Sequence, residues 1–339
     1  MVTDSKNIAW INNAKALCMI AVYYIHSQVY YGYGPVGDFL AYSMLPFYVN
    51  LFFFVSGFLF LTKHVAVDKA AAIGTQTRKS LASVLYKLAI PTVLFATLIY
   101  IPKLMFHSRE ISFGQYLYDV FGGVSFWFTS ALTIVQLIFI FLTSVGVRNS
   151  WWLMFIGLLL FVSGNFLEIF TTGPFPWHYK SAMCASFFFA AGGLFGKYSG
   201  HLSRIGKWRF ILIPLYALLM LLTYDHRSSF MFGSMGVGYN MAGILVCIFA
   251  IVVVQFISEI IGRNRILEYI GRRSIVFYFF SGVMPALWGT LMLKLIPEPG
   301  DLSLFLVTTV SLVASASLTW FIERFLPFLT DLRNLSVKK

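Results

Sequence analysis

Two residues whose side chains could carry out chemistry lie in the first apolar stretch of the chain, Ile8 to Tyr30. They are Lys15 and His26. In an α-helix each residue turns the chain by about 100° and advances it by about 1.5 Å, so His26 lies on nearly the same face as Lys15, roughly 16 Å farther along the axis. An ionisable side chain inside a membrane helix is costly unless it meets a partner or a water-filled cavity. The spacing therefore predicts that this face lines a polar cavity rather than lipid.

The two side chains suit different parts of one reaction. Histidine can act as a general base because its pKa lies near neutrality, and lysine is a compact cation that suits a phosphate or the oxygen of a thioester. A coenzyme A thioester, which has phosphates and a long thin pantetheine arm, would use both groups. Cys18 on the same stretch could be a nucleophile, but a small packed apolar residue is the favoured interpretation. The three cysteines form no CxxC pair or Cys/His cluster, so neither a metal site nor a disulfide framework is predicted.

The composition indicates a polytopic membrane protein. Of the 339 residues, 59% are hydrophobic and only 11% are charged, whereas a soluble domain has about 25% charged residues. The formal net charge is +12. Membrane proteins place Lys and Arg on cytoplasmic loops, so a basic total is expected and we predict no nucleic-acid binding.

A segment of roughly 20 apolar residues crosses the hydrocarbon core of a membrane. This length predicts an all-α integral membrane protein: a bundle of about ten transmembrane helices that encloses a polar cavity, in a single domain over residues 1–339. The predicted spans are 8–30, 39–62, 81–102, 126–146, 151–167, 182–197, 210–224, 241–261, 274–296 and 302–323. The segment Ile111 to Gly123 is too short to cross, so we expect an interfacial or re-entrant piece.

The distribution of Lys and Arg predicts the orientation. These residues concentrate in every second connection and in the C-terminal tail, so both termini are expected in the cytoplasm and the protein in the inner (plasma) membrane. Lys15 then lies nearer the cytoplasm and His26 near the outer face. His178 and His226 fall on outer connections, where solvated loop residues are expected. The cytoplasmic connections supply a basic rim of Arg78, Lys79, Lys207, Arg209, Arg272 and Arg273.

Several motifs occur in an order that resembles the family-3 membrane acyltransferases. The hallmark of that family is an Arg or Lys, ten residues, and then His in the first span, which Lys15 and His26 match. Asn12 stands where related branches often have Asp, and Ser281 stands where a His is common. The further matches are FFxxSGF at 52–58, KLAIP at 87–91, Trp127, Phe128 and Leu132, FFFAAGGLFGK at 187–197, Gly271, Ser274 and Tyr278, and FIER at 321–324.

The resemblance implies transfer of an acyl group, most often acetyl, from cytoplasmic acyl-CoA to a hydroxyl of a polysaccharide or other glycan at the outer face. The acyl-CoA is a co-substrate, and no permanently bound cofactor is expected. His26 would be the catalytic base, with either direct transfer or an acyl-histidine intermediate. The expected donor-binding residues are Lys15, Arg78, Lys79, Arg272 and Arg273. The expected cavity-lining residues are Asn12, Ser56, Trp127, Gln136 and Tyr278.

Some roles stay open at this point. Ser56 and Gly57 are expected chiefly to allow close helix packing. The expected partners are acyl-CoA, the glycan acceptor and the lipid bilayer, and a homo-oligomer is possible. The acids that could orient His26 are Asp38, Glu110, Asp119, Glu168 and Asp225.

Two other functions compete with an enzyme. A transporter or flippase for a polysaccharide or lipid-linked sugar would also need many spans and a polar stripe. A structural partner of a polysaccharide synthase would leave Lys15 and His26 unexplained. The Lys-x10-His spacing with its ordered companions, together with the lack of an evident inverted repeat, favours the enzyme.

Overall fold

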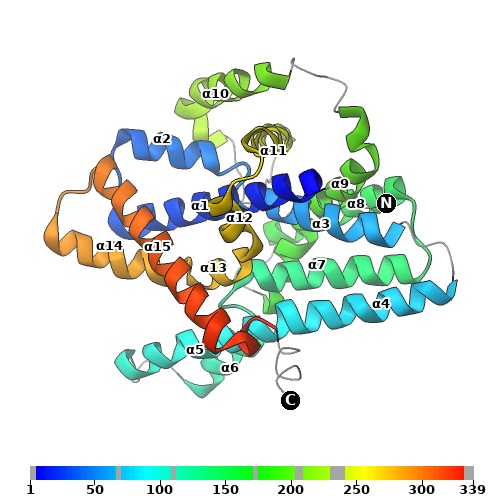
Figure 1. Cartoon of the computed structure of the whole chain (residues 1–339), viewed down its shortest axis with the longest axis horizontal. Coiled ribbons are helices and arrows are strands. Elements are labelled where there is room, and N and C mark those ends of the chain that lie inside the picture. Colours follow the sequence, from blue (N-terminus) through cyan, green and yellow to red (C-terminus); the bar gives the residue numbers. More distant parts are fainter. Residues whose placement is uncertain are drawn as a thin grey trace. The chain divides into compact units, whose positions relative to one another are not determined.

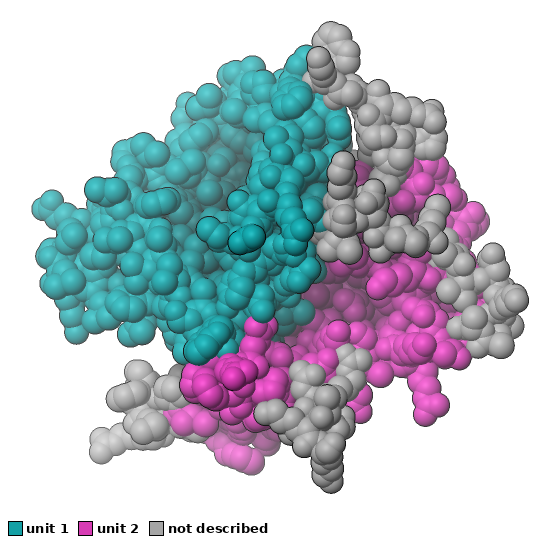
Figure 2. All heavy atoms as spheres, in the orientation of Figure 1, with its two compact units in different colours: residues 1–55, 200–320 teal, residues 56–199, 321–339 magenta. Residues whose placement is uncertain are grey.

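The computed structural model describes residues 5–65, 70–107, 112–170, 175–202, 209–229 and 241–331, and every regular element in these ranges is a helix (Figure 1). The predicted all-α class is confirmed. The chain divides into two compact units (Figure 2). Unit 1 contains Met1–Val55 and Gly200–Trp320, and unit 2 contains Ser56–Ser199 and Phe321–Lys339.

Unit 1 is built around its first helix. That helix, α1, packs against α2, α11, α12, α13 and α14, and it buries Ala14, Ala16, Cys18, Met19 and Tyr23 almost completely. A helix that is apolar on most of its sides is stable only when it is covered on most of its sides. The helices of unit 1 are α1 (Ser5–Tyr31), α2 (Pro35–Met44), α10 (Leu212–Thr223), η4 (Tyr224–Ser229), α11 (Met241–Ile261), α12 (Arg265–Arg272), α13 (Ser274–Phe280), α14 (Val283–Leu295) and most of α15 (Asp301–Phe325).

Unit 2 begins within α3 (Asn50–Val65) and contains one long helical run with a local π-turn. The turn covers Leu85–Ala89 and precedes Pro91. Proline has no N–H and its ring collides with the carbonyl four residues earlier, so a regular helix cannot continue through this point and the chain widens locally. The run consists of α4 (Ala70–Val84), the π-turn η1 (Leu85–Ala89) and α5 (Ile90–His107). The other helices of unit 2 are α6 (Phe113–Phe121), α7 (Trp127–Ser144), α8 (Ser150–Phe170), η2 (Pro176–His178), α9 (Tyr179–Leu202) and η5 (Pro327–Leu329).

Six helices among the described residues are long and apolar enough to cross a membrane, or seven if the bent pair α13–α14 counts as one span. Each coincides with a predicted span, so a multi-pass membrane protein is supported, while the predicted total of about ten stays a prediction. Helix α1 is not among the six and carries Asn12, Asn13, Lys15 and His26. The six are Ile73–Ile101, Trp127–Ser144, Ser150–Leu167, Arg209–His226, Gly243–Ile261 and Asp301–Phe325.

Two predicted spans are broken helices. The segment 39–62 forms the end of α2, a turn at 45–49, and α3. Pro46 lies in that turn, and the side chain of Asn50 donates to its carbonyl at 3.0 Å. The segment 274–296 forms α13 and α14, which are bent by 44°. Prolines and glycines explain such breaks because they remove or weaken helical hydrogen bonds.

The segment predicted as interfacial or re-entrant contains α6, which has nine residues and is too short to cross a bilayer. The hydroxyl of Ser112 accepts a hydrogen bond from the backbone N–H of Gln115 at 3.1 Å and begins the helix. Phe113 and Phe121 at its two ends are exposed.

Close packing of α3 and α9 holds unit 2 together. A Cβ atom at Gly57 would overlap the backbone carbonyl of Phe189, and one at Gly193 would overlap the side chain of Leu61. The backbones of the two helices therefore touch at Gly57, and the Leu61 side chain lies against the α9 backbone at Gly193. The packing role expected for Gly57 is confirmed.

We expect Gly57→Ala to destabilise the protein by about 1–3 kcal/mol, because the added methyl group meets backbone that cannot move without displacing α9. Thermal unfolding in detergent measures this. Gly74→Ala is the matched control: Gly74 also lies in a helix, but no atom lies within 4 Å of an added Cβ. Equal melting temperatures for the two variants would contradict this account of the α3–α9 contact.

Candidate active site

Helix α1 is unbroken from Ser5 to Tyr31, so the helical spacing predicted between Lys15 and His26 is confirmed. The two side chains lie on nearly one face and about 16 Å apart along the axis. Both are half-buried. The candidate site therefore has two ends, which different helices of unit 1 surround.

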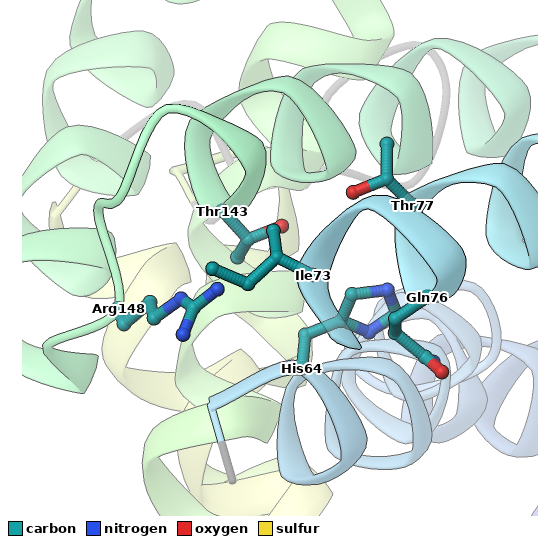
Figure 3. A pocket seen from close by; sticks show the side chains of 6 residues that line it. All are labelled: His64, Ile73, Gln76, Thr77, Thr143 and Arg148. Atoms are coloured by element: carbon teal, nitrogen blue, oxygen red, sulfur yellow. The ribbon is translucent and has the colours of Figure 1, made fainter. Parts of the chain in front are cut away.

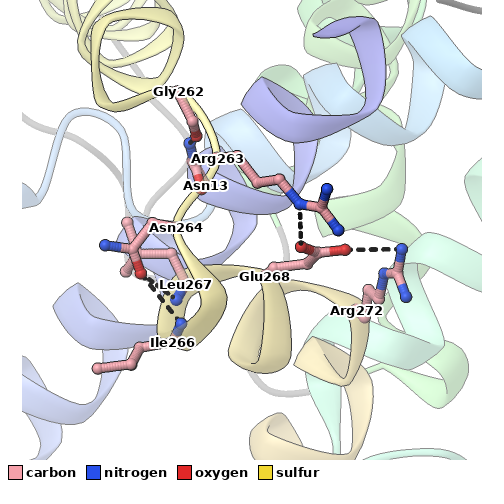
Figure 4. Close-up of polar contacts among 8 residues, drawn as sticks. All are labelled: Asn13, Gly262, Arg263, Asn264, Ile266, Leu267, Glu268 and Arg272. Carbon is pink, nitrogen blue, oxygen red and sulfur yellow. Dashed lines mark hydrogen bonds and ion pairs between the residues drawn. The ribbon is translucent and has the colours of Figure 1, made fainter. Parts of the chain in front are cut away.

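At the Lys15 end, α1 fits tightly against α11 and α12. A Cβ atom at Gly271 would overlap the backbone carbonyl of Asn12, so glycine is needed where α12 crosses α1. The side-chain amide of Asn13 donates to the carbonyls of Ser258 at 3.0 Å and Gly262 at 2.6 Å. Figure 4 shows Asn13 beside Gly262. These carbonyls lie at the C-terminal end of α11, where the last carbonyls of a helix have no N–H donor within the helix. Asn13 thus fixes the end of α11 to α1.

Lys15 enters none of the ion pairs found among the described residues. Asn12, which stands where an acid is common in related branches, is 6% exposed and lies in the contact with α12. A half-buried ammonium group without a carboxylate partner is energetically unfavourable in a membrane protein. It also leaves a cation that is able to attract an anionic ligand.

Arginines gather around α12. Asn264 caps this helix, with its side-chain oxygen accepting from the N–H groups of Ile266 and Leu267 at 3.0 Å each. Figure 4 shows Arg263 and Arg272 turned toward one carboxylate, Glu268, at 3.7 Å and 2.7 Å. The two arginine side chains are 85% and 61% exposed. Exposed pairs of this kind contribute little stability, so these guanidinium groups can exchange partners.

Two further arginines of the predicted basic rim have well-defined positions. The Arg273 guanidinium lies 4.2 Å from the centre of the Tyr269 ring, and the Tyr269 hydroxyl donates to the carbonyl of Ala316 at 3.0 Å. Arg209 pairs with Glu259 on α11 at 2.7 Å. Lys207 lies outside the described residues.

At the His26 end, the neighbouring feature is the break between α13 and α14. Ser281 lies in this break, and both α13 and α14 pack against α1. Tyr278 is half-buried one turn earlier, and its carbonyl accepts from the Ser281 hydroxyl at 2.8 Å. The Tyr23 hydroxyl donates to the carbonyl of Phe277 at 2.8 Å and so ties α13 to α1.

Two of the acids proposed from the sequence, Asp38 and Asp119, have other hydrogen-bonding partners. Asp38 accepts from the Tyr224 hydroxyl at 2.5 Å. Asp119 belongs to unit 2 and accepts from the Tyr100 hydroxyl at 3.1 Å. Asp225 is exposed on η4. Glu110 and the Glu168 side chain lie outside the described residues. Sequence reasoning missed Asn13, whose amide bonds to the carbonyls of Ser258 and Gly262, because the sequence carries no signal for contacts so far apart in the chain.

The other expected site residues belong to unit 2. Arg78 and Lys79 are exposed on α4, and Ser56, Trp127 and Gln136 are half-buried on α3 and α7. The remaining expected site residues all belong to unit 1: Asn12, Lys15, His26, Tyr278, Arg272 and Arg273.

His226 is exposed as expected, but the expectation that His178 is a solvated loop residue is wrong. His178 is 5% exposed, and its ring lies 3.2 Å from the carbonyl of Val124. Trp177 and His178 both adopt left-handed backbone angles, with φ of 55° and 47°, and this turn places the imidazole inward. Burial lowers the pKa of His178, and the hydrogen bond with Val124 opposes that shift.

Unit 2 also contains a small hollow near the end of α3, the start of α4 and the end of α7 (Figure 3). It is lined by His64, Ile73, Gln76, Thr77, Thr143 and Arg148. Both ring nitrogens of His64 have partners at 2.8 Å, the carbonyl of Phe60 and the hydroxyl of Ser80. The hollow contains neither Lys15 nor His26, so the predicted polar cavity around those two residues stays a prediction.

Comparison with known protein families shows which family the chain belongs to. The model of an acyltransferase domain matches residues 8–324, nearly the whole chain. The chain belongs to acyltransferase family 3. Comparisons with curated proteins and with solved structures found no match. The family predicted from the motifs is thus confirmed, and the protein is a membrane acyltransferase.

In this acyltransferase, the amide of Asn13 holds two helices of the site together. We expect Asn13→Leu to lower the free energy of unfolding by about 1–3 kcal/mol, because it leaves the carbonyls of Ser258 and Gly262 without donors. Asn165→Leu is the matched control, since the Asn165 amide bonds only to the carbonyl of Phe161 in its own helix. Denaturation in detergent should show a larger loss in the free energy of unfolding for Asn13→Leu than for Asn165→Leu. The reverse order would contradict the role of Asn13 in holding α11 against α1.

Proposed function

We propose that this acyltransferase moves an acyl group, most simply acetyl, from cytoplasmic acyl-CoA to a hydroxyl of a polysaccharide or other glycan at the outer face of the inner membrane. The observation that carries this proposal is the placement of Lys15 and His26 on one face of one helix. Family membership supports acyl transfer, and the motif resemblance supports the donor and the acceptor.

The donor is proposed to bind at the Lys15 end. The phosphates of coenzyme A carry several negative charges, and Arg263, Arg272 and Arg273 lie on or beside α12, which packs against the same helix as Lys15. Guanidinium groups bind phosphate oxygens through paired hydrogen bonds, and an ammonium group acts as a compact point charge. Arg78 and Lys79, which the sequence also suggested for the donor, are exposed on α4 of unit 2.

The reaction is proposed to occur at His26. An extended pantetheine arm spans the roughly 16 Å between the two residues, so the thioester would reach the imidazole. His26 takes the proton of the sugar hydroxyl as its oxygen attacks the thioester carbon. The carbon–sulfur bond then breaks, the acyl group stays on the sugar oxygen, and the coenzyme A sulfur leaves with a proton. The Lys and Arg distribution supports cytoplasmic termini, which would put the donor end inside and His26 near the outer face.

Mass spectrometry of surface glycans tests the proposal in cells. Deletion of the gene should remove an acyl modification, and plasmid-borne wild type should restore it. An unchanged acylation pattern together with a loss of exported glycan would instead indicate a transporter.

We expect His26→Ala to lower acyl transfer by about 100-fold or more, the usual contribution of a general base, while thermal stability and coenzyme A binding persist. Initial rates with purified protein, acyl-CoA and glycan measure the effect. Gln28→Ala is the matched control, because Gln28 lies two residues after His26 on α1 and makes only a 3.5 Å contact with Asp38. Near-normal transfer by folded His26→Ala protein would refute a catalytic role for His26.

We expect Lys15→Ala to weaken coenzyme A binding about tenfold or more, because a charge-assisted contact to a phosphate or thioester oxygen is lost. The stabilisation of the protein by coenzyme A against heat should shrink accordingly. Lys15→Arg keeps the charge and should retain most of the effect. Unchanged stabilisation in a folded Lys15→Ala protein would exclude a role for Lys15 in donor binding.

A further inference from the structure

Four buried polar atoms on α1, α14 and α15 have no hydrogen-bonding partner in the described part of the chain. They are the hydroxyls of Ser27 and Tyr31 on α1, the indole N–H of Trp288 on α14 and the hydroxyl of Ser311 on α15. Ser27 and Ser311 are 0% exposed, and Tyr31 is 2% exposed. Buried polar groups in native proteins are nearly always paired, and ordered water supplies the partner where protein atoms do not.

The two serine hydroxyls do not use the acceptor that their own helices offer. A serine inside a helix can donate to the carbonyl four residues earlier, as buried Ser186 does to Ala182 at 2.9 Å. Ser27 and Ser311 make no such bond within the described residues. Their hydroxyls are therefore turned away from those carbonyls, although both side chains lie in the protein interior.

Two contacts set the register between α1 and α15. The Tyr23 hydroxyl lies 2.6 Å from the Ser315 hydroxyl, and Tyr31 packs in one buried cluster with Val307. Residue numbers rise along α1 from the first contact to the second and fall along α15. The two helices therefore pass each other in opposite directions.

Ser27 and Ser311 each lie in the turn between these contacts, four residues from the contact residue on either side. Four residues make about one helical turn, so the two serines lie at the same level and on facing sides of the helices. Tyrosine side chains reach across at the turns on either side, whereas here two small side chains face each other. The Trp288 ring packs against the cluster that contains Tyr31, which brings its N–H to the same region.

We propose that Ser27, Tyr31, Trp288 and Ser311 form a binding site for ordered water between α1, α14 and α15. Water suits these groups because a hydroxyl can donate or accept, an indole N–H donates, and a buried water makes about three hydrogen bonds. All four polar atoms are shielded from the surface. A sugar or a lipid head group could therefore not reach them unless the helices separated.

The site lies beside the turn that carries His26, because Ser27 is the next residue of α1. In the proposed reaction the His26 imidazole gains a positive charge when it takes up a proton. A charge is costly in apolar surroundings, and water dipoles nearby reduce that cost. Only this consequence rests on the proposed function. The tests of the water site need no acyl transfer, so the site and the function can fail separately.

Removal of single hydroxyls tests the site, because a water site and an unpaired hydroxyl predict opposite effects on stability. If water binds, Tyr31→Phe and Ser311→Ala each leave the other polar atoms with fewer partners. We then expect each to lower the melting temperature in detergent by about 2 °C or more. The double variant should lose less than the sum, because both changes remove ligands of the same water.

Ser186→Ala is the matched control, because the Ser186 hydroxyl is equally buried but bonds within its own helix. Its melting temperature should change less. An unchanged or raised melting temperature for Tyr31→Phe or Ser311→Ala, or strictly additive losses in the double variant, would overturn the proposal.

Radiolytic labelling in water enriched in heavy oxygen gives a second readout on the unmodified protein. Hydroxyl radicals formed from an internal water oxidise the side chains beside it, so mass spectrometry should find heavy oxygen on Tyr31. Tyr42 is the control, because it is also buried and its hydroxyl bonds to Thr223 at 2.9 Å; it should remain unlabelled. Absence of label on Tyr31 would overturn the proposal even if a variant failed to fold.

Discussion

The structure of unit 1 depends on keeping polar groups satisfied inside a helix bundle that belongs in a membrane. Bulk water is not available there, so each buried donor or acceptor needs a partner from the protein or from an ordered water molecule. The amide of Asn13 meets the last carbonyls of α11, and the Tyr23 hydroxyl meets the carbonyl of Phe277. These bonds set α1 against its neighbours. Lys15 enters none of the ion pairs among the described residues, so its ammonium group has no carboxylate partner there and could attract an anionic ligand.

The same requirement gathers residues that are far apart in the sequence. Asn13 and Ser258 are 245 positions apart, yet they are joined by a 3.0 Å hydrogen bond. Gly271 allows α12 to touch the backbone of α1, which brings the arginines of α12 into the same unit as Lys15. One helix thereby contacts a cationic region at one end and a helix break at the other. A cation that could attract a phosphate and an imidazole that could take up a proton thus lie on one helix.

The sequence was sufficient to predict helices α1 and α11 and the spacing of Lys15 and His26 on α1, because helical spacing and span length are local properties. It was insufficient to predict the helix breaks within the segments 39–62 and 274–296. Pro46 and Pro285 were visible, but hydropathy alone does not tell whether a proline bends a helix or ends it; packing of the surrounding helices decides that. The partner of His26 was sought among acids such as Asp38, which accepts from the Tyr224 hydroxyl instead. His178 was misjudged because a left-handed turn, invisible in the sequence, places it inward.

The most direct test of the central claim is transfer across a reconstituted membrane. Acyl-labelled acyl-CoA would be enclosed in proteoliposomes that carry the purified protein in its cellular orientation, and the glycan would be added outside. The account expects the label to appear on the external glycan, with free coenzyme A released inside in equal amount, and expects neither with His26→Ala protein. Movement of glycan across the membrane without label, or labelling that requires acyl-CoA and glycan on the same side, would contradict it.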